Sequence, residues 1–228
     1  VLFFAFLWPT FRLRDPWSPE GLQALLGHLL LYHNLDAASF ATINPSFWTI
    51  AVEMQLYLVY PVLVWVSARS GWNTALAMAA GVEVAIRVVL SAGGPGPDSS
   101  AMFALRYSPF AYWGSWTLGA WLAEAFRTGQ LPRMGMASMV VACTATVAAS
   151  LVRPLEEFVF PLGCIATFVV LGRHLDGVGR TGMAGGSGNP LARHLSFVGL
   201  CSYSVYLIHQ PLAAGGFNAL KRYLGLEH

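Results

Sequence analysis

Long runs of apolar residues, separated by short polar stretches, extend along the whole chain. We mark eight such segments: 1–11, 19–34, 46–66, 74–91, 102–126, 134–152, 158–171, and a last one that begins near Leu191 and passes through His209. A helix needs about 20 apolar residues to cross a bilayer, and runs approaching this length recur from end to end. The pattern therefore predicts an all-α fold, a polytopic transmembrane helix bundle of about eight membrane segments that forms one domain over residues 1–228.

The segment ends carry signals for helix starts and stops. Ser18 and Pro19 are the residue types of an N-cap and a first helical turn, and Pro211 is expected to kink or end the last segment. The first run rises only ~16 Å as a helix, about half of a bilayer core. We therefore expect Val1 to lie inside a truncated helix, and we expect the domain to be incomplete at its C-terminus as well.

The longest connector, residues 173–190, is rich in glycine. Gly177, Gly179 and Gly182 have the GxGxxG spacing of dinucleotide sites, but no strand precedes them and no βαβ unit surrounds them. A flexible linker is the better interpretation.

Composition agrees with a membrane protein. Hydrophobic residues make up 56% of the chain and charged residues only 11%, whereas soluble domains average about 25% charged. The formal net charge of +2 is too small to indicate nucleic-acid binding. Cys143, Cys164 and Cys201 lie in apolar segments without metal-ligand spacing, so we interpret them as small core residues. Neither a metal site nor a bound cofactor is expected.

Ionisable side chains inside apolar segments are functional candidates, because they are costly at membrane depth. They are His28, His33, Glu53, Glu83, Arg87, Arg106, Glu124 and His209. The i, i+4 spacing of Glu83 and Arg87 favours an ion pair within one helix over a substrate role. Arg106 and Glu124 lie near segment ends, where long side chains reach the membrane interface. For His28 and His33, a hydrogen bond to a backbone carbonyl and a functional role are equal alternatives.

Glu53 stands out among these residues. Apart from two tyrosines it is the only ionisable side chain from Phe47 to Val66, and we identify no partner for it at i±3 or i±4. Glu53 and His209 lie ~10 and ~12 Å from segment ends that open to the same side of an alternating bundle. Other polar residues come to that side as well: His33, Asn34, Arg87 and Arg106. We therefore expect one wet cavity, with Glu53 facing it.

Two stretches resemble signatures of the integral-membrane acyltransferase-3 family. PSFWTIAVEMQLYLVYP is similar to W-S-L-[sv]-x-E-x-x-F-Y-x-x-x-P, on which Trp48, Glu53, Tyr57 and Pro61 fall. LSFVGLCSYSVYLIHQPL is similar to G-x-x-S-Y-x-x-Y-L-x-H-x-P, and its matching residues are Gly199, Ser202, Tyr203, Tyr206, Leu207, His209 and Pro211. Thr49, Ile50 and Met54 depart from the family's usual serine, leucine and glutamate. The family's early helix, with an arginine and a catalytic histidine, would precede Val1.

The resemblance implies a membrane-embedded O-acyltransferase. Such enzymes move an acetyl or other short acyl group from acyl-CoA to a hydroxyl of a sugar, a cell-surface polysaccharide or a related acceptor. The expected partners are therefore acyl-CoA (acetyl-CoA foremost), a carbohydrate acceptor and the lipid bilayer, with the protein a multi-pass component of a bacterial inner membrane. Glu53 and His209 are the catalytic candidates. Substrate contacts are expected from Trp48, Tyr57, Arg106, Tyr203, Tyr206, His33 and Asn34.

Two other interpretations stay open at this point. Buried glutamate, histidine and arginine around a wet cavity are also typical of small-solute transporters, although the sequence lacks the paired interrupted helices that many of them show. The second interpretation is that the chain is an inactive fragment of an acyltransferase. The aromatic candidates have an alternative of their own, since tyrosine and tryptophan favour membrane interfaces whatever their function.

Overall fold

The computed structural model describes residues 18–44, 46–93, 99–130, 135–181, 221 and 223, with only the backbone of 173–181. These residues form helices and turns, and no strand occurs among them. The chain divides into two compact units, residues 1–52 with 187–228 and residues 53–186. The predicted all-α class is thus confirmed for the described part of the chain.

The first unit begins with α2, Pro19–Leu29. Its predicted N-cap is confirmed, because the Ser18 hydroxyl accepts a hydrogen bond from the Gly21 N–H at 3.1 Å. The predicted segment 19–34 is too long for one helix: Leu31 adopts a left-handed backbone conformation with φ 58°. A short 3₁₀ turn, η2 (His33–Leu35), follows it.

The turn after η2 is organised by Asp36. Its carboxylate accepts hydrogen bonds from the Ser39 hydroxyl at 2.5 Å, the Gln23 amide at 3.0 Å and the Ala38 N–H at 3.2 Å. Partial burial acts to raise the pKa of Asp36, but these hydrogen bonds together outweigh it and lower the pKa. The ionised carboxylate thereby ties this turn back to α2.

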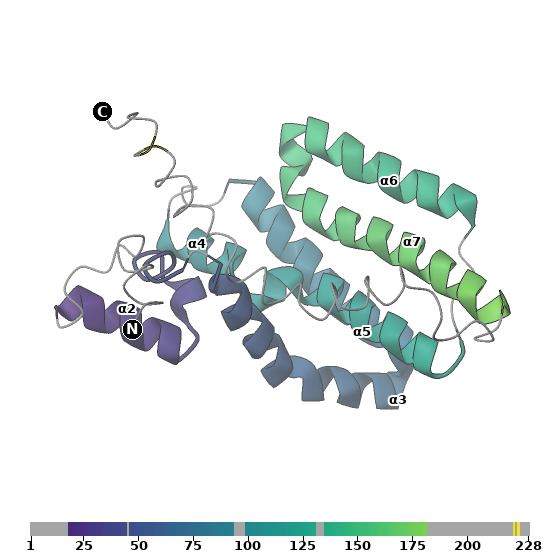
Figure 1. Cartoon of the computed structure of the whole chain (residues 1–228), viewed down its shortest axis with the longest axis horizontal. Helices are drawn as coiled ribbons and strands as arrows, with labels where there is room; N and C mark the ends of the chain where they lie inside the picture. Colours follow the sequence, from purple (N-terminus) through teal and green to yellow (C-terminus); the bar gives the residue numbers. More distant parts are fainter. Residues whose placement is uncertain are drawn as a thin grey trace. The chain divides into compact units, whose positions relative to one another are not determined.

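Helix α3, Trp48–Ser91, contains two of the predicted segments without a loop between them. Its two halves meet at Gly71, whose φ of 81° and ψ of 163° are non-helical and disfavoured for residues with a side chain. Figure 1 shows the chain changing direction within α3. The helix is therefore interrupted between the predicted segments 46–66 and 74–91, at Gly71, with no loop there.

The predicted segment 102–126 is wrong as one continuous helix. It contains α4 (Ser100–Arg106), the 3₁₀ turn η3 (Pro109–Tyr112) and α5 (Trp113–Arg127). Pro109 has no N–H and disfavours a helical residue before it, so Ser108 is extended with ψ 153°.

The second unit ends in a helical pair. Helix α6 (Met136–Leu151) leads through the 3₁₀ turn η4 (Arg153–Phe158) into α7 (Val159–Thr181), and α6 and α7 pack side by side (Figure 1). Their core with α5 consists of Leu122, Ala142, Phe168 and Val169. Because α7 continues to Thr181, the first half of the predicted connector 173–190 is helical. Residues 182–190 and the predicted last segment lie outside the described residues.

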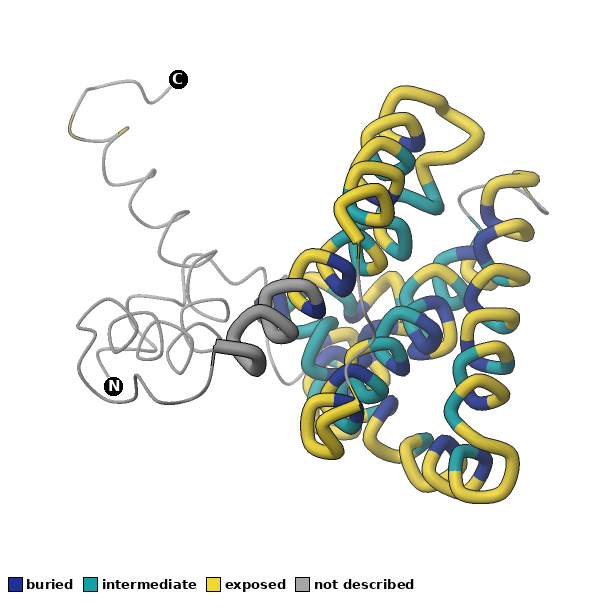
Figure 2. Tube along the Cα trace, turned by 90° about the vertical axis from the view of Figure 1, so that its right-hand side faces the viewer, coloured by how far each residue is buried: buried dark blue, intermediate teal, exposed yellow. Residues whose placement is uncertain are grey.

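Within the described residues, two helical stretches are long and apolar enough to cross a membrane: Trp48–Ser91 and Arg153–Gly172. Helix α6 is apolar but shorter. Figure 2 shows exposed residues recurring along the described helices, and several of them are large and aliphatic. Leu58 is 81% exposed, Leu151 79% and Val141 67%. Such side chains are favourable against lipid and unfavourable against water.

A buried ion pair connects α3 to its neighbours in the second unit. Arg87 pairs with Glu83 at 3.0 Å, with side chains only 6% and 3% exposed, which confirms the predicted pair. Arg87 also donates to the backbone carbonyls of Glu157 in η4 (2.5 Å) and Ala111 in η3 (2.7 Å). The Glu83 carboxylate accepts from the Ser115 N–H at 2.7 Å and from its hydroxyl at 2.9 Å. The pair thus fixes three segments against α3.

Gly114 allows α5 to approach α3 closely. A Cβ atom added there would lie 2.6 Å from the Ala80 Cα and 3.1 Å from Glu83 Oε2. Real Cβ atoms essentially never come so near to backbone, so any side chain at 114 would push the helices apart.

We expect Gly114→Ala to destabilise the second unit by ~1–3 kcal/mol, because the added methyl overpacks this contact. Gly119→Ala on the same helix is the matched control: it meets nothing within 4 Å, and alanine is the better helix former. Thermal unfolding in detergent should show a lower Tm for Gly114→Ala alone. Equal Tm values for the two variants would contradict the close packing.

We expect Arg87→Met to destabilise the protein by ~3–5 kcal/mol, because Glu83 would be left buried without its countercharge. Arg127→Met, in the exposed pair of Arg127 with Glu124, should leave the Tm unchanged. Adding Glu83→Gln to Arg87→Met should recover part of the loss, since the buried charge disappears. A double variant less stable than Arg87→Met would argue against this electrostatic explanation.

Candidate functional site

Glu53 lies in the first half of α3 and is half-buried. The Tyr57 hydroxyl, one helical turn further on, donates a hydrogen bond to Glu53 Oε1 at 2.7 Å. The expectation that Glu53 lacks a partner in its own helix is therefore wrong. Residues at i and i+4 face each other on a helix, and a phenol can reach a carboxylate there as an uncharged donor.

An aromatic cluster adjoins this pair. Trp116 of α5 contacts Tyr57 edge to face, with ring centroids 6.2 Å apart and planes at 69°. It contacts Tyr60 in the same way at 5.7 Å and 83°. No pattern in the sequence marks Trp116, because a contact between helices so far apart in the chain leaves no local signal.

The first unit contains the next group of predicted site residues. His33 and Asn34 are 1% and 0% exposed. The rings of His28 and His33 stack at 3.8 Å and 8°, and their Nδ1 atoms lie 2.8 and 3.3 Å from the carbonyls of Ala24 and Gly27. The backbone-carbonyl interpretation is thus confirmed for both Nδ1 atoms. The two Nε2 atoms are buried and make no hydrogen bond to any residue that the structure describes.

Trp48, also in this unit, stacks on Phe40 with centroids 6.0 Å apart and planes at 26°. Its ring therefore has an aromatic neighbour from the loop before α3. A rigid aromatic surface of this kind suits contact with a sugar ring as well as simple packing.

Arg106, at the end of α4, is 47% exposed and pairs with Glu157 of η4 at 2.6 Å. Glu124, the other charge expected near a segment end, pairs with Arg127 at 2.7 Å on the surface of α5. Both positions agree with their expected place near helix ends.

Three predicted site residues, Tyr203, Tyr206 and His209, lie outside the described residues. Glu53 and the pair His33–Asn34 belong to different units. The single wet cavity joining all these residues stays a prediction. Within the described ranges, no group of three or more His, Cys, Asp or Glu residues could hold a metal ion.

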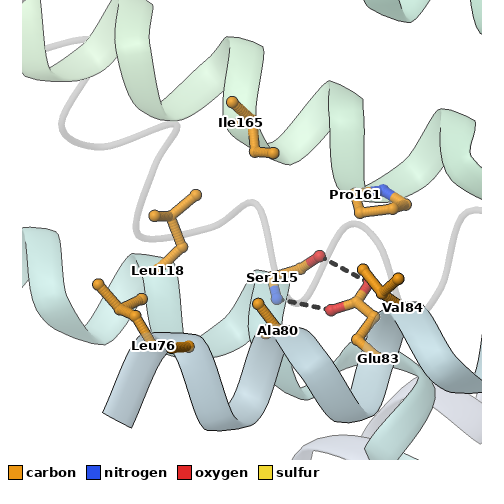
Figure 3. Close-up of a pocket in the computed structure, with 10 residues that line it drawn as sticks. Leu76, Ala80, Glu83, Val84, Ser115, Leu118, Pro161 and Ile165 are labelled. Atoms are coloured by element: carbon orange, nitrogen blue, oxygen red, sulfur yellow. Dashed lines mark hydrogen bonds between the residues drawn. The ribbon is translucent and has the colours of Figure 1, made fainter. Parts of the chain in front are cut away.

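The second unit contains a pocket of about 370 Å³. Its walls come from α3, α5 and α7, and Figure 3 shows Leu76, Leu118 and Ile165 around it. Its polar lining residues are Glu83 and Ser115, which hydrogen-bond to each other. Glu53 does not line this pocket.

Comparison with known proteins identifies the family. Searches of curated proteins and of solved structures each find no match. The family model of the acyltransferase-3 family, described as an acyltransferase domain, matches residues 1–225. This match includes Glu53, Tyr57 and both signature stretches. The chain therefore belongs to the acyltransferase-3 family and is an acyltransferase.

Proposed function

We propose that this acyltransferase is membrane-embedded and O-specific. It transfers an acetyl or other short acyl group from acyl-CoA to a hydroxyl of a sugar, a cell-surface polysaccharide or a related acceptor. The observation that carries the proposal is a half-buried glutamate, Glu53, in an apolar helix, hydrogen-bonded to Tyr57 at 2.7 Å. Family membership favours this function over solute transport.

The chemistry needs a base near the acceptor. As the hydroxyl oxygen attacks the thioester carbonyl, its proton passes to the base, the C–S bond breaks and coenzyme A leaves as a thiol after taking up a proton. Glu53 suits the role of base. Tyr57 holds Oε1, and in the described part of the chain Oε2 accepts no hydrogen bond, so it can accept the hydroxyl proton.

Other residues have supporting roles in the proposal. His209 orients or protonates reacting groups, since imidazole titrates near neutrality. Arg106, about half-exposed beside Glu157, offers a positive charge to the acyl-CoA donor. His33 and Asn34 provide polar contacts to the acceptor. Aromatic surfaces for the sugar come from Trp48, Tyr57, Tyr203 and Tyr206.

The membrane location rests on the apolar spans. The two candidate spans in α3 and around α7, together with exposed aliphatic side chains such as Leu58, favour a multi-pass protein facing lipid. We assign it to a bacterial inner membrane, where acyl-CoA reaches it from the cytoplasm.

Membranes containing the wild-type chain should transfer label from [¹⁴C]acetyl-CoA to carbohydrate. The label should be released by mild base, because O-acetyl esters hydrolyse under those conditions. [¹⁴C]acetate without coenzyme A serves as the control and should give no labelled carbohydrate. Absence of transfer from acetyl-CoA and from other short acyl-CoA donors would contradict the proposed function.

Glu53→Gln should lower kcat for acetyl transfer by about 10²–10⁴-fold, the usual contribution of a general base. The glutamine keeps an oxygen for the Tyr57 hydroxyl, so the Tm should change little. Glu124→Gln, which removes an exposed carboxylate on α5, is the matched control and should retain full activity. Undiminished transfer by Glu53→Gln would exclude Glu53 as the base.

A further inference from the structure

Trp116 of α5 packs against several side chains of α3. Its indole ring meets Tyr57 and Tyr60 at 69° and 83°, with centroids 6.2 and 5.7 Å away. Near-perpendicular contacts at these distances are favourable for aromatic rings, because the edge of one ring carries positive charge and the face of the other negative charge. Trp116 of α5 thus contacts two tyrosines that are three residues apart, on one face of α3.

The rest of the second unit holds Trp116 in place. It packs against a buried cluster of Leu63, Val66 and Ala75, which lies on both sides of the bend at Gly71. The residue before it, Ser115, hydrogen-bonds to Glu83 through both its N–H and its hydroxyl. These contacts hold the indole ring in one position next to Tyr57.

The side-chain conformation of Tyr57 depends on its packing neighbours. Tyr57 is 50% exposed, and its hydroxyl donates to Glu53 Oε1 from the side-chain conformation seen in the structure. A side chain without packing neighbours samples several staggered conformations. The contact with Trp116 restricts that sampling.

We propose that Trp116 is a positioning residue of the acyltransferase. It holds Tyr57 so that the phenol donates to Glu53 Oε1, which leaves Oε2 directed to the acceptor hydroxyl. Trp116 acts on the reaction only through Tyr57. The inference rests on the proposed role of Glu53.

Trp116→Leu should lower kcat for acetyl transfer from acetyl-CoA about tenfold and leave KM for acetyl-CoA unchanged. Trp121→Leu is the matched control on α5: Trp121 stacks on Phe168 at 5.4 Å and 18° in the separate core with α6 and α7. It should lower the Tm but keep kcat. Trp116→Phe, which retains a ring, should fall between wild type and Trp116→Leu. In a Tyr57→Phe background, Trp116→Leu should cause no further loss of kcat.

A second measurement does not depend on turnover. With 3-fluorotyrosine at position 57 of the full chain, the ¹⁹F signal should shift in Glu53→Gln and in Trp116→Leu and stay in place in Trp121→Leu. An unchanged signal in Trp116→Leu would overturn the proposal. Equal losses of kcat in the two tryptophan variants would also overturn it, because they would indicate general destabilisation. If wild type transferred no acyl group, the proposed function would fail, and the ¹⁹F comparison would still decide whether Trp116 positions Tyr57.

Discussion

A buried carboxylate and guanidinium, one helical turn apart on α3, form the constraint on which the second unit depends. Charges removed from water are tolerated only when their remaining donors and acceptors find partners. For Glu83 and Arg87 those partners are Ser115 and the backbone carbonyls of Ala111 and Glu157. Because backbone groups cannot move independently of their segments, satisfying the pair determines where η3, the start of α5 and η4 pack. The break before α5 serves this requirement, since the 3₁₀ turn presents the Ala111 carbonyl to Arg87.

Features set by neighbours in sequence were predictable. The Ser18 cap depends on one turn of backbone, and the Glu83–Arg87 pair on the i, i+4 geometry of a helix. Arg106 pairs with Glu157, 51 residues away, and no periodicity in the chain indicates such a contact. Local sequence patterns do not indicate which distant segments come together. Family signatures can mark residues of one site across the chain, although they give no physical reason for the arrangement.

The failures have physical causes too. Segment 102–126 is apolar throughout, and apolar periodicity does not register that Pro109 removes a donor and forces Ser108 out of the helix. The partner of Glu53 is not evident from charge pairing at i±3 and i±4, because Tyr57 donates as a neutral phenol. Trp116 lay beyond sequence reasoning altogether, since its position follows from the bend of α3 at Gly71 and the close approach of α5. On either side of this bend, the core cluster of Leu63, Val66 and Ala75 and the two tyrosines, Tyr57 and Tyr60, all pack with Trp116 of α5.

The two glutamates of α3 show why enclosure alone is a poor guide to catalysis in this protein. Glu83 is 2% exposed and lines the pocket of about 370 Å³, features that usually mark an active site. Yet its oxygens already accept hydrogen bonds from Arg87 and Ser115. Protonation of Glu83 would also leave the buried Arg87 without its countercharge. Glu53 is half-buried and keeps one oxygen without a hydrogen bond among the described residues, while Tyr57 holds the other. A carboxylate that exchanges protons with a substrate needs such a spare acceptor. Glu83 therefore has a structural role, and we propose Glu53 rather than Glu83 as the base.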